Sequence, residues 1–207
     1  MIRAVLWDFG GVILTSPFEA FAAYERQLGL PEGFIRRVNT VNPDSNAWAR
    51  LERSELDVVG FAAAFESEAR DLGGELDGGQ IVGLLAGAIR PQMVAALKRL
   101  RGSYRLACLT NNVANGDGGD RRPEVVEVME LFDLVVESSK VGVRKPERRF
   151  YELACEQLGV EPAECVFLDD LGVNLKPARE MGMITIKVED PDVALADLEQ
   201  VLGITLQ

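Results

Sequence analysis

The sequence contains no histidine, only three cysteines and no long apolar run. Without histidine, Ser-His and Cys-His nucleophile pairs, histidine zinc ligands and histidine acid–base catalysis are excluded, so proton transfer falls to carboxylates, lysine, tyrosine or water. The cysteines have no close metal-ligand spacing, and Cys108 and Cys165 are interpreted as small buried hydrophobes in a reducing compartment. No stretch can span a membrane and none resembles a signal peptide, so the expected location is cytoplasmic.

Basic residues are scarce relative to acidic ones. The chain carries 22 Lys and Arg against 33 Asp and Glu, a formal net charge of −11. This balance argues against a nucleic-acid partner and against an anionic membrane, both of which favour a basic face. A phosphorylated substrate would meet the same long-range repulsion, so a phosphate site must supply local positive charge. Lys145 and a bound metal are the candidates for that charge.

The length of 207 residues allows one core domain with a smaller insert. Residues 2–7 form a nearly continuous apolar run, which is typical of a strand buried on both faces. Between residues 17 and 88, apolar residues recur at helical spacing with glycine and proline between them, and no convincing strand is present. The sequence therefore predicts a helical insert of three to five helices at 17–88, inside a core made of 1–16 and 89–207.

Strand-like and helix-like segments alternate after residue 88. This alternation predicts an α/β fold with a Rossmann-like, doubly wound parallel sheet, whose site lies at the carboxyl ends of the strands. The polar, glycine-rich residues 113–122 are expected to form a loop beside that site. The expected strands are 104–109, 133–137, 165–168 and 184–188, and the expected helices follow Pro91 and cover 124–131, 147–158, 174–181 and 192–202.

Chemically reactive side chains follow several of these strands. Asp8 ends the first strand and is followed by two glycines, which allow a backbone to approach a ligand closely. Together the candidates supply a nucleophile, a hydroxyl, a cation and a carboxylate pair, a set that predicts Mg²⁺-assisted phosphoryl transfer through Asp8. Asn111 and Asn112 either turn the chain or contact the substrate. The candidates are Asp8, Thr110, Asn111, Asn112, Lys145, Asp169, Asp170 and Asn174.

In this order and spacing the motifs resemble those of the haloacid dehalogenase-like hydrolase superfamily, over nearly the whole chain. The segments 48–53, 138–146 and 167–179 are similar to the phosphatase domain that precedes soluble epoxide hydrolase. The resemblance implies a Rossmann-like core with a helical cap at about residues 17–88. It also implies a magnesium ion held by the Asp8 carboxylate, the Gly10 backbone carbonyl and Asp170.

The resemblance further implies how the remaining candidates contribute. Asp169 and Asn174 would hold metal-bound water, and Thr110 with Lys145 would grip the phosphate. Asp8 would attack phosphorus and form an aspartyl-phosphate that water then hydrolyses. A small phosphorylated metabolite is the expected partner, and a homo-oligomer is left open. Asn111 and Asn112 are the expected substrate contacts.

The sequence departs from the phosphatase pattern at Gly10. Phosphatases of this kind have a second aspartate there, which protonates the leaving group, and general acid catalysis is typically worth about 10² to 10⁴ in rate. One interpretation is a phosphatase for good leaving groups such as sugar-1-phosphates, aryl phosphates or acyl phosphates. The alternatives are a dehalogenase-type hydrolase in which Asp8 attacks carbon, and a phospho-ligand binding module with little or no turnover.

Within the insert, polar residues are interpreted as surface residues and aromatic residues as core. The run Arg50, Glu52, Arg53 and Glu55 is expected to form a solvated helix face with weak ion pairs. Trp48 is expected to pack in the core of the insert rather than to contact a ligand.

Overall fold

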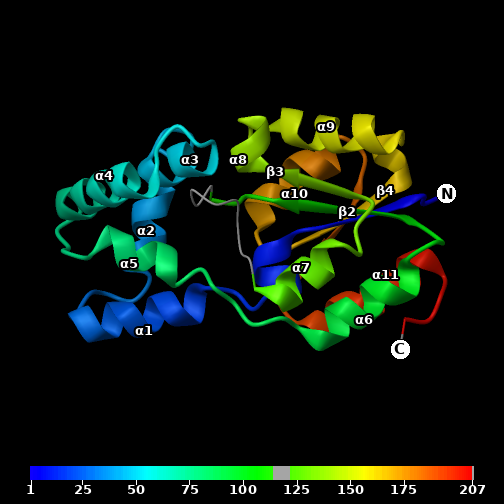
Figure 1. Ribbon diagram of the computed structural model, residues 1–207, viewed down its shortest axis with the longest axis horizontal. Coiled ribbons are helices and arrows are strands. Elements are labelled where there is room, and N and C mark those ends of the chain that lie inside the picture. The colour runs from blue at the N-terminus through cyan, green and yellow to red at the C-terminus, as the bar shows by residue number, and fades with distance from the viewer. Residues whose placement is uncertain (114–121, 207) are drawn as a thin grey trace.

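The computed structural model describes residues 1–113 and 122–206, and within these residues it contains a five-stranded parallel sheet. The strand order is β3-β2-β1-β4-β5, so β1 is central and pairs with β2 on one side and β4 on the other. Figure 1 shows these strands running toward the helical insert with their carboxyl ends. The bounds are β1 (Ala4–Trp7), β2 (Arg105–Thr110), β3 (Leu134–Glu137), β4 (Cys165–Asp169) and β5 (Ile184–Lys187).

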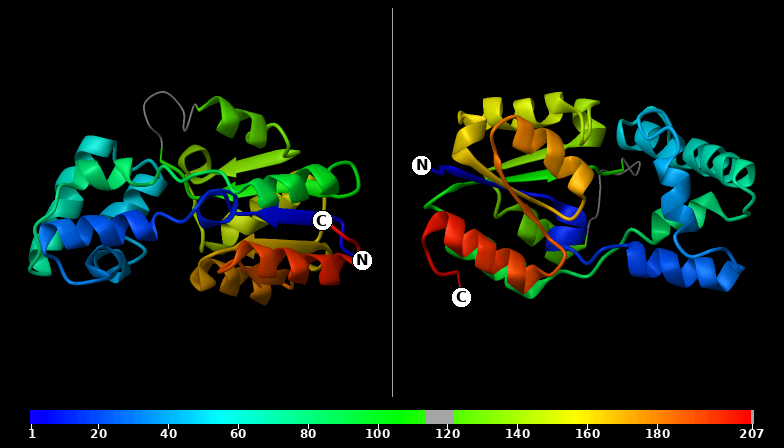
Figure 2. Two further views of the ribbon diagram at one scale, coloured as in Figure 1. Left: turned by 90° about the horizontal axis from the view of Figure 1, so that it is seen from below. Right: turned by 180° about the vertical axis from the view of Figure 1, so that it is seen from behind.

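Helices cover both faces of the sheet, as Figures 1 and 2 show. One face carries α6 (Pro91–Leu100), α7 (Pro123–Met129) and α11 (Pro191–Leu202), and the other carries α9 (Arg148–Leu158) and α10 (Gly172–Glu180), with the short α8 (Ser138–Val141) after β3. Val5 and Trp7 pack into the first hydrophobic cluster, and Ala4 and Leu6 pack into the second. Because side chains alternate along a strand, β1 is buried on both faces. The predicted doubly wound fold is confirmed.

The insert forms its own hydrophobic cluster beside the carboxyl ends of the strands, at the opposite side of the molecule from both termini (Figure 2). The rings of Trp48 and Phe61 lie 5.3 Å apart edge to face, and those of Phe61 and Phe65 stack at 5.2 Å. No strand lies in the fully described stretch 17–88, as expected. Its helices are α1 (Phe18–Leu28), α2 (Phe34–Thr40), α3 (Ala47–Glu52), α4 (Val58–Asp71) and α5 (Gly78–Gly83).

The bounds predicted for the strands and helices of the core differ from the observed ones by no more than two residues at either end. The predicted loop 113–122 lies outside the described residues except at its two ends. The cysteines Cys108, Cys155 and Cys165 are all free and buried. Among the described helices, none combines the length and the apolar character that crossing a membrane requires.

Candidate active site

Asp8 is fixed where the central strand ends. Its N–H donates to the Leu168 carbonyl at 2.8 Å, which extends the pairing of β1 with β4 by one residue. Its carboxylate is 7% exposed, and Oδ1 accepts the N–H of Phe9 at 2.6 Å. The second oxygen, Oδ2, has no hydrogen-bond donor among the described residues. One oxygen is therefore held by the protein, and the other is available to a ligand.

Lys145 is a buried cation between two carboxylates. Its side chain is 1% exposed, with Nζ 2.7 Å from Asp8 Oδ1 and 2.8 Å from Asp169 Oδ2. Burial by itself lowers the pKa of Lys145, but Asp169 and Asp8 outweigh it and raise that pKa above its ordinary value. Burial is also the largest influence on Asp8 and raises its pKa, against the opposing effect of Lys145. Lys145 thus stays charged and compensates the nucleophile candidate.

The hydrogen-bonding capacity of Asp169 is taken up by protein donors. It is fully buried, its Oδ1 accepts the N–H of Leu171 at 2.8 Å, and Asn174 Nδ2 lies 3.0 and 3.1 Å from its two oxygens. Lys145 occupies the remaining direction on Oδ2. Asp169 therefore orients Lys145 and Asn174, while its contact with metal-bound water stays a prediction.

Asp170 lies against Gly11, and this close approach needs glycine. Gly11 has a φ of +76°, and a Cβ built on it would lie 2.2 Å from Asp170 Oδ2. Burial, helped by Asp169, raises the pKa of Asp170 from 3.8 to about 6. Oxygens of Asp8, Asp169 and Asp170 all lie within 4.8 Å of one another. Carboxylates gathered this closely ionise more easily when a cation lies between them. Their oxygens are the ligands that a hard divalent cation such as Mg²⁺ prefers.

The three residues after β2 divide into one open group and two engaged ones. Thr110 is 7% exposed, and its hydroxyl makes no hydrogen bond within the described part of the chain. Asn111 clamps the main chain of Lys145, accepting its N–H at 2.8 Å and donating to its carbonyl at 2.9 Å. Asn112 donates to Glu137 at 2.9 Å. The Thr110 hydroxyl is free to meet a phosphoryl oxygen, whereas substrate contact by the asparagines stays a prediction.

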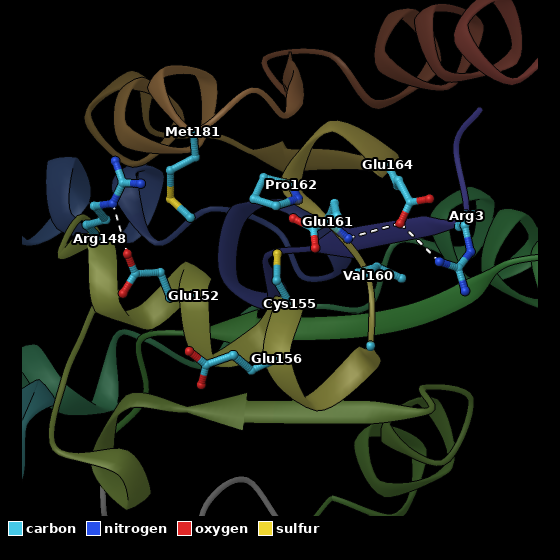
Figure 3. A pocket seen from close by; sticks show the side chains of 11 residues that line it. Arg3, Arg148, Glu152, Cys155, Glu156, Val160, Glu161, Pro162, Glu164 and Met181 are labelled. Atoms are coloured by element: carbon cyan, nitrogen blue, oxygen red, sulfur yellow. Dashed lines mark hydrogen bonds and ion pairs between the residues drawn. The ribbon is translucent and has the colours of Figure 1, made fainter.

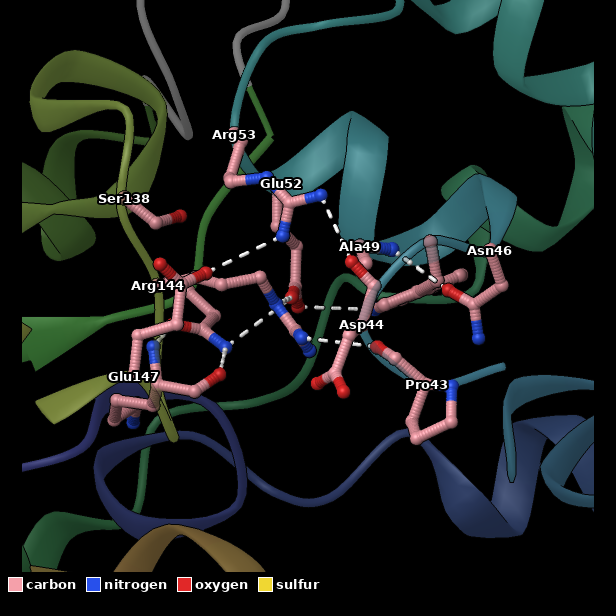
Figure 4. A network of polar contacts seen from close by, with 12 residues as sticks. Pro43, Asp44, Asn46, Ala49, Glu52, Arg53, Ser138, Arg144 and Glu147 are labelled. Carbon is pink, nitrogen blue, oxygen red and sulfur yellow. Dashed lines mark hydrogen bonds and ion pairs between the residues drawn. The ribbon is translucent and has the colours of Figure 1, made fainter. Parts of the chain in front are cut away.

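One residue expected on a solvated face is buried beside the site. Glu52 ends α3, is 7% exposed, and accepts the Trp48 Nε1–H at 2.9 Å and the Asn111 Nδ2–H at 3.1 Å, together with an ion pair from Arg144 (Figure 4). Burial is the largest influence on its pKa and raises it, although Arg144 opposes this. The prediction of a solvated face is wrong for Glu52. Its spacing of four residues from Trp48, itself expected in the core, was the signal that placed it on the buried face.

A separate hollow of about 510 Å³ lies at the opposite ends of β1 and β4. Figure 3 shows that it is lined mainly by charged side chains, among them Arg3, Arg148, Glu152 and Glu164. Arg3 pairs with Glu164 at 3.0 Å, with 56% and 29% of the two side chains exposed. None of the site residues expected from the sequence lines this hollow. The site residues expected from the sequence therefore lie apart from this hollow.

The family model for haloacid dehalogenase-like hydrolases matches residues 2–182. The chain belongs to this family of hydrolases, as the order of its motifs predicted. The matched span includes the whole carboxylate cluster and Lys145.

Two relatives and one solved structure illustrate the similarity. The chain is 33% identical to bifunctional epoxide hydrolase 2 of Sus scrofa, over 99% of this chain and 40% of that protein. It is 26% identical to a sesquiterpene phosphatase of Aspergillus oryzae, over 97% of each. Its fold resembles a HAD family enzyme of Bacteroides thetaiotaomicron in complex with magnesium and inorganic phosphate, with a TM-score of 0.59, 22% identity, and 92% and 97% of the two chains covered. The chain spans well under half the length of the Sus scrofa protein.

Proposed function

We propose that this hydrolase is a Mg²⁺-dependent phosphatase that cleaves phosphate monoesters through an aspartyl-phosphate on Asp8. The observation that carries the proposal is the buried Lys145 ammonium between Asp8 and Asp169, with the Asp170 carboxylate beside them. A carboxylate that attacks a phosphate dianion meets like-charge repulsion, and this arrangement supplies fixed positive charge at the nucleophile. The phosphatase relative and the neighbour crystallised with magnesium and phosphate support the same chemistry.

The residues of this chain divide the work as follows. Asp8 Oδ2 attacks phosphorus, the new O–P bond forms as the bond to the leaving oxygen breaks, and the leaving oxygen takes the electron pair. Lys145 holds Asp8 through Oδ1, and its positive charge opposes the rise in the Asp8 pKa that burial causes. The Thr110 hydroxyl donates to a phosphoryl oxygen. Water then attacks phosphorus, which releases inorganic phosphate and restores the Asp8 carboxylate.

The ligands of the metal would be the side chains of Asp8 and Asp170 and the Gly10 carbonyl. Asn174 would contact metal-bound water, and Asp169 would support the ligands by orienting Asn174 and Lys145. When bound, Mg²⁺ neutralises the charge between nucleophile and phosphate and orients the phosphoryl oxygens. The absence of a side chain on Gly11 leaves the space that Asp170 needs to join this set.

Gly10 determines which substrates suit this site. It leaves no carboxylic acid two residues after the nucleophile, so the leaving group must depart with little protonation. Anomeric sugar phosphates, aryl phosphates and acyl phosphates meet this requirement better than primary alkyl phosphates. The proposed substrate is therefore a small phosphorylated metabolite with a good leaving group, such as a sugar-1-phosphate.

Phosphate release from a panel of aryl, anomeric sugar and primary alkyl phosphates tests the proposal, with Mg²⁺ and with EDTA. Release that requires Mg²⁺ and favours the good leaving groups is expected. Activity that persists in EDTA toward 2-haloacids would instead assign attack on carbon. If folded protein that binds Mg²⁺ releases no phosphate from any substrate of the panel, the protein is instead a phospho-ligand binding module.

Gly10→Asp probes the missing acid directly. Gly10 has φ −68° and ψ 133°, which any residue can adopt, and a Cβ built on it has no atom within 4 Å. The aspartate should fit and raise turnover most on primary alkyl phosphates, by part of the factor of about 10² to 10⁴ that general acid catalysis supplies. A larger gain on aryl phosphates, measured on the same panel, would contradict this account of Gly10.

A further inference from the structure

One buried carboxylate of the insert, that of Glu52, lies beside the proposed active site. Glu52 comes from α3, and the groups it meets across the boundary are Arg144 and Asn111 of the core, as the dashed contacts to Arg144 in Figure 4 illustrate. Both core donors converge on one oxygen, Oε2, while Trp48 of the same helix occupies Oε1. With 9% of its side chain exposed, Glu52 is shielded from water, so these contacts are not competed away by solvent.

Asn111 joins Glu52 to the main chain of the proposed catalytic lysine. Its Oδ1 accepts the Lys145 N–H at 2.8 Å, while its Nδ2 donates to the Lys145 carbonyl at 2.9 Å and to Glu52 at 3.1 Å. Both hydrogens of the amide nitrogen are thereby used. The orientation of this amide group, and with it the clamp on Lys145, depends on the acceptor that Glu52 provides.

Arg144 completes the connection from the neighbouring position in the sequence. Its Nε pairs with Glu52 and its Nη1 donates to the Pro43 carbonyl at 3.3 Å, so its guanidinium lies against the insert. The side chain of Lys145 points to the other side, toward Asp8 and Asp169. Two consecutive residues therefore tie the insert to the nucleophile.

We propose that Glu52 is a positioning residue for the phosphatase reaction, which acts through Asn111 and Arg144 to hold Lys145 against Asp8 only while the insert is seated on the core. The inference rests on the proposed function and deepens it. Seating of the insert and placement of the lysine then become one event, because the same carboxylate serves both. We call this connection the Glu52–Asn111–Lys145 bridge.

A second ion pair between insert and core provides a matched control. Arg53 Nη1 lies 3.3 Å from Glu147 Oε1, with 37% of the Glu147 side chain exposed, and within the described residues neither side chain makes a hydrogen bond or ion pair with Asn111 or Lys145. Glu147→Gln makes the same carboxylate-to-amide change as Glu52→Gln at the same boundary. It differs in leaving the bridge intact, so the two variants separate positioning from simple attachment of the insert.

The first measurement is hydrogen exchange of the peptide 142–147, which contains the Lys145 amide, in each variant. Glu52→Gln should accelerate exchange in this peptide by at least about tenfold, because a weakened Asn111 clamp lets the Lys145 N–H open locally. Glu147→Gln should leave the exchange rate of the Lys145 N–H as in the parent. This measurement needs no substrate, so it stands or falls separately from the proposed phosphatase activity. Equal exchange in the two variants would overturn the inference.

The second measurement is turnover of the best phosphate ester on the panel. Glu52→Gln should lower kcat by about 10- to 100-fold, because the lysine is misplaced in the reacting complex, with KM changed by less than about threefold. Glu147→Gln should stay within about twofold of the parent, as expected for a half-exposed ion pair. A loss confined to KM, or equal losses in both variants, would refute positioning.

Asn111→Ala cuts the bridge in its middle and guards against a Glu52 variant that fails to fold. It should accelerate exchange of the 142–147 peptide as well. Because Glu52 acts partly through Asn111, the double variant should lose less kcat than the two single losses combined would give, since residues in one chain of contacts are not additive. Fully additive losses, or an unchanged Lys145 amide in Asn111→Ala, would exclude the bridge.

Discussion

The two ends of the parallel sheet carry charges in opposite ways. At the carboxyl end, Lys145 is almost completely buried between Asp8 and Asp169. At the amino end, Arg3 and Glu164 pair beside an open hollow, with 56% and 29% of their side chains exposed to water (Figure 3). The same kind of contact, an ammonium or guanidinium within about 3 Å of a carboxylate, therefore occurs in two very different dielectric surroundings.

The comparison distinguishes ion pairs on the surface from the buried charges that the proposed reaction would use. Taking ions out of water costs several kcal/mol per ion. Replacing a buried ion pair by apolar residues of the same size is therefore often neutral, or stabilises the fold by about 1 to 4 kcal/mol. Stability thus does not explain the cluster around Lys145, whereas compensation of the charge on Asp8, the proposed nucleophile, would explain it. The exposed pairs at the amino end have no such requirement.

Asp8→Asn should have the largest effect on the carboxyl end. The amide keeps the shape and loses the nucleophilic charge, so turnover should fall by at least about 10⁴-fold, as for the loss of other nucleophiles. Phosphate release measures the loss, and circular dichroism checks that the fold is kept. The exposed Asp192 on α11 gives a matched aspartate-to-asparagine control with unchanged turnover. Residual activity near the parent level would remove Asp8 from the mechanism.

Lys145→Met should produce the largest loss of stability. It leaves Asp8 and Asp169 buried without their cation, which typically costs about 3 to 5 kcal/mol of unfolding free energy. Urea unfolding at pH 8 in EDTA measures this loss. The control is Lys187→Met, which breaks an exposed pair with Glu189 and should change the unfolding free energy by less than about 1 kcal/mol. Similar losses in both variants would show that burial does not distinguish the two sites.

Asp170→Asn should change how stability depends on pH in metal-free protein. Because burial raises the folded-state pKa of Asp170 from 3.8 to about 6, the folded protein binds this proton more tightly than the unfolded chain. The free energy of unfolding therefore falls as pH rises from about 4 to about 6, by up to about 3 kcal/mol for a shift of about two units.

In EDTA, the free energy of unfolding of the asparagine variant should not fall in this way between pH 4 and pH 6. The variant should therefore be more stable than the parent at pH 8. With saturating Mg²⁺ the order should reverse, since the variant loses a metal ligand. Thermal unfolding at pH 5 and pH 8, with and without Mg²⁺, gives all four values. A parent that is insensitive to Mg²⁺ would contradict the metal assignment.

Arg3→Gln should have the smallest effect. It breaks the pair with Glu164 at the amino end, and exposed pairs contribute about 0 to 1 kcal/mol. Turnover should not change, because the site lies at the other end of the strands. Urea unfolding and phosphate release on the same preparations check both statements, and a loss as large as that of Lys145→Met would remove the distinction between the two ends.

Most of the fold could be predicted from the sequence because its signals are local. The apolar run before Asp8 and the alternation of strands and helices after residue 88 depend on neighbouring residues only. The order of strands in the sheet is different, because it is set by pairings such as Ala4 with Arg105 and with Cys165, which no local pattern encodes.

The site could be predicted only where residues follow strands. The positions of Asp8, Thr110 and Asp169 at strand ends were enough to expect them together, since parallel strands end at one edge. Glu52 was missed because a carboxylate at the end of a short helix usually faces water, and its main partner Arg144 lies far along the chain. The contact of Asp170 with Gly11 was hidden for the same reason, although the glycine itself was noticed.

The pairing of β1 also sets when the charge cluster can form during synthesis. Residues far apart in the sequence meet in this cluster, because Asp8 follows the first strand and Asp169 ends the fourth. Joining strands so distant in sequence requires long loops to close before the contacts stabilise them, so assembly of the sheet is expected to limit the folding rate. A nascent chain that stops before Asp170 contains the nucleophile and the whole insert but no complete charge cluster. The charge cluster is therefore incomplete until β4 and the residue after it have been made.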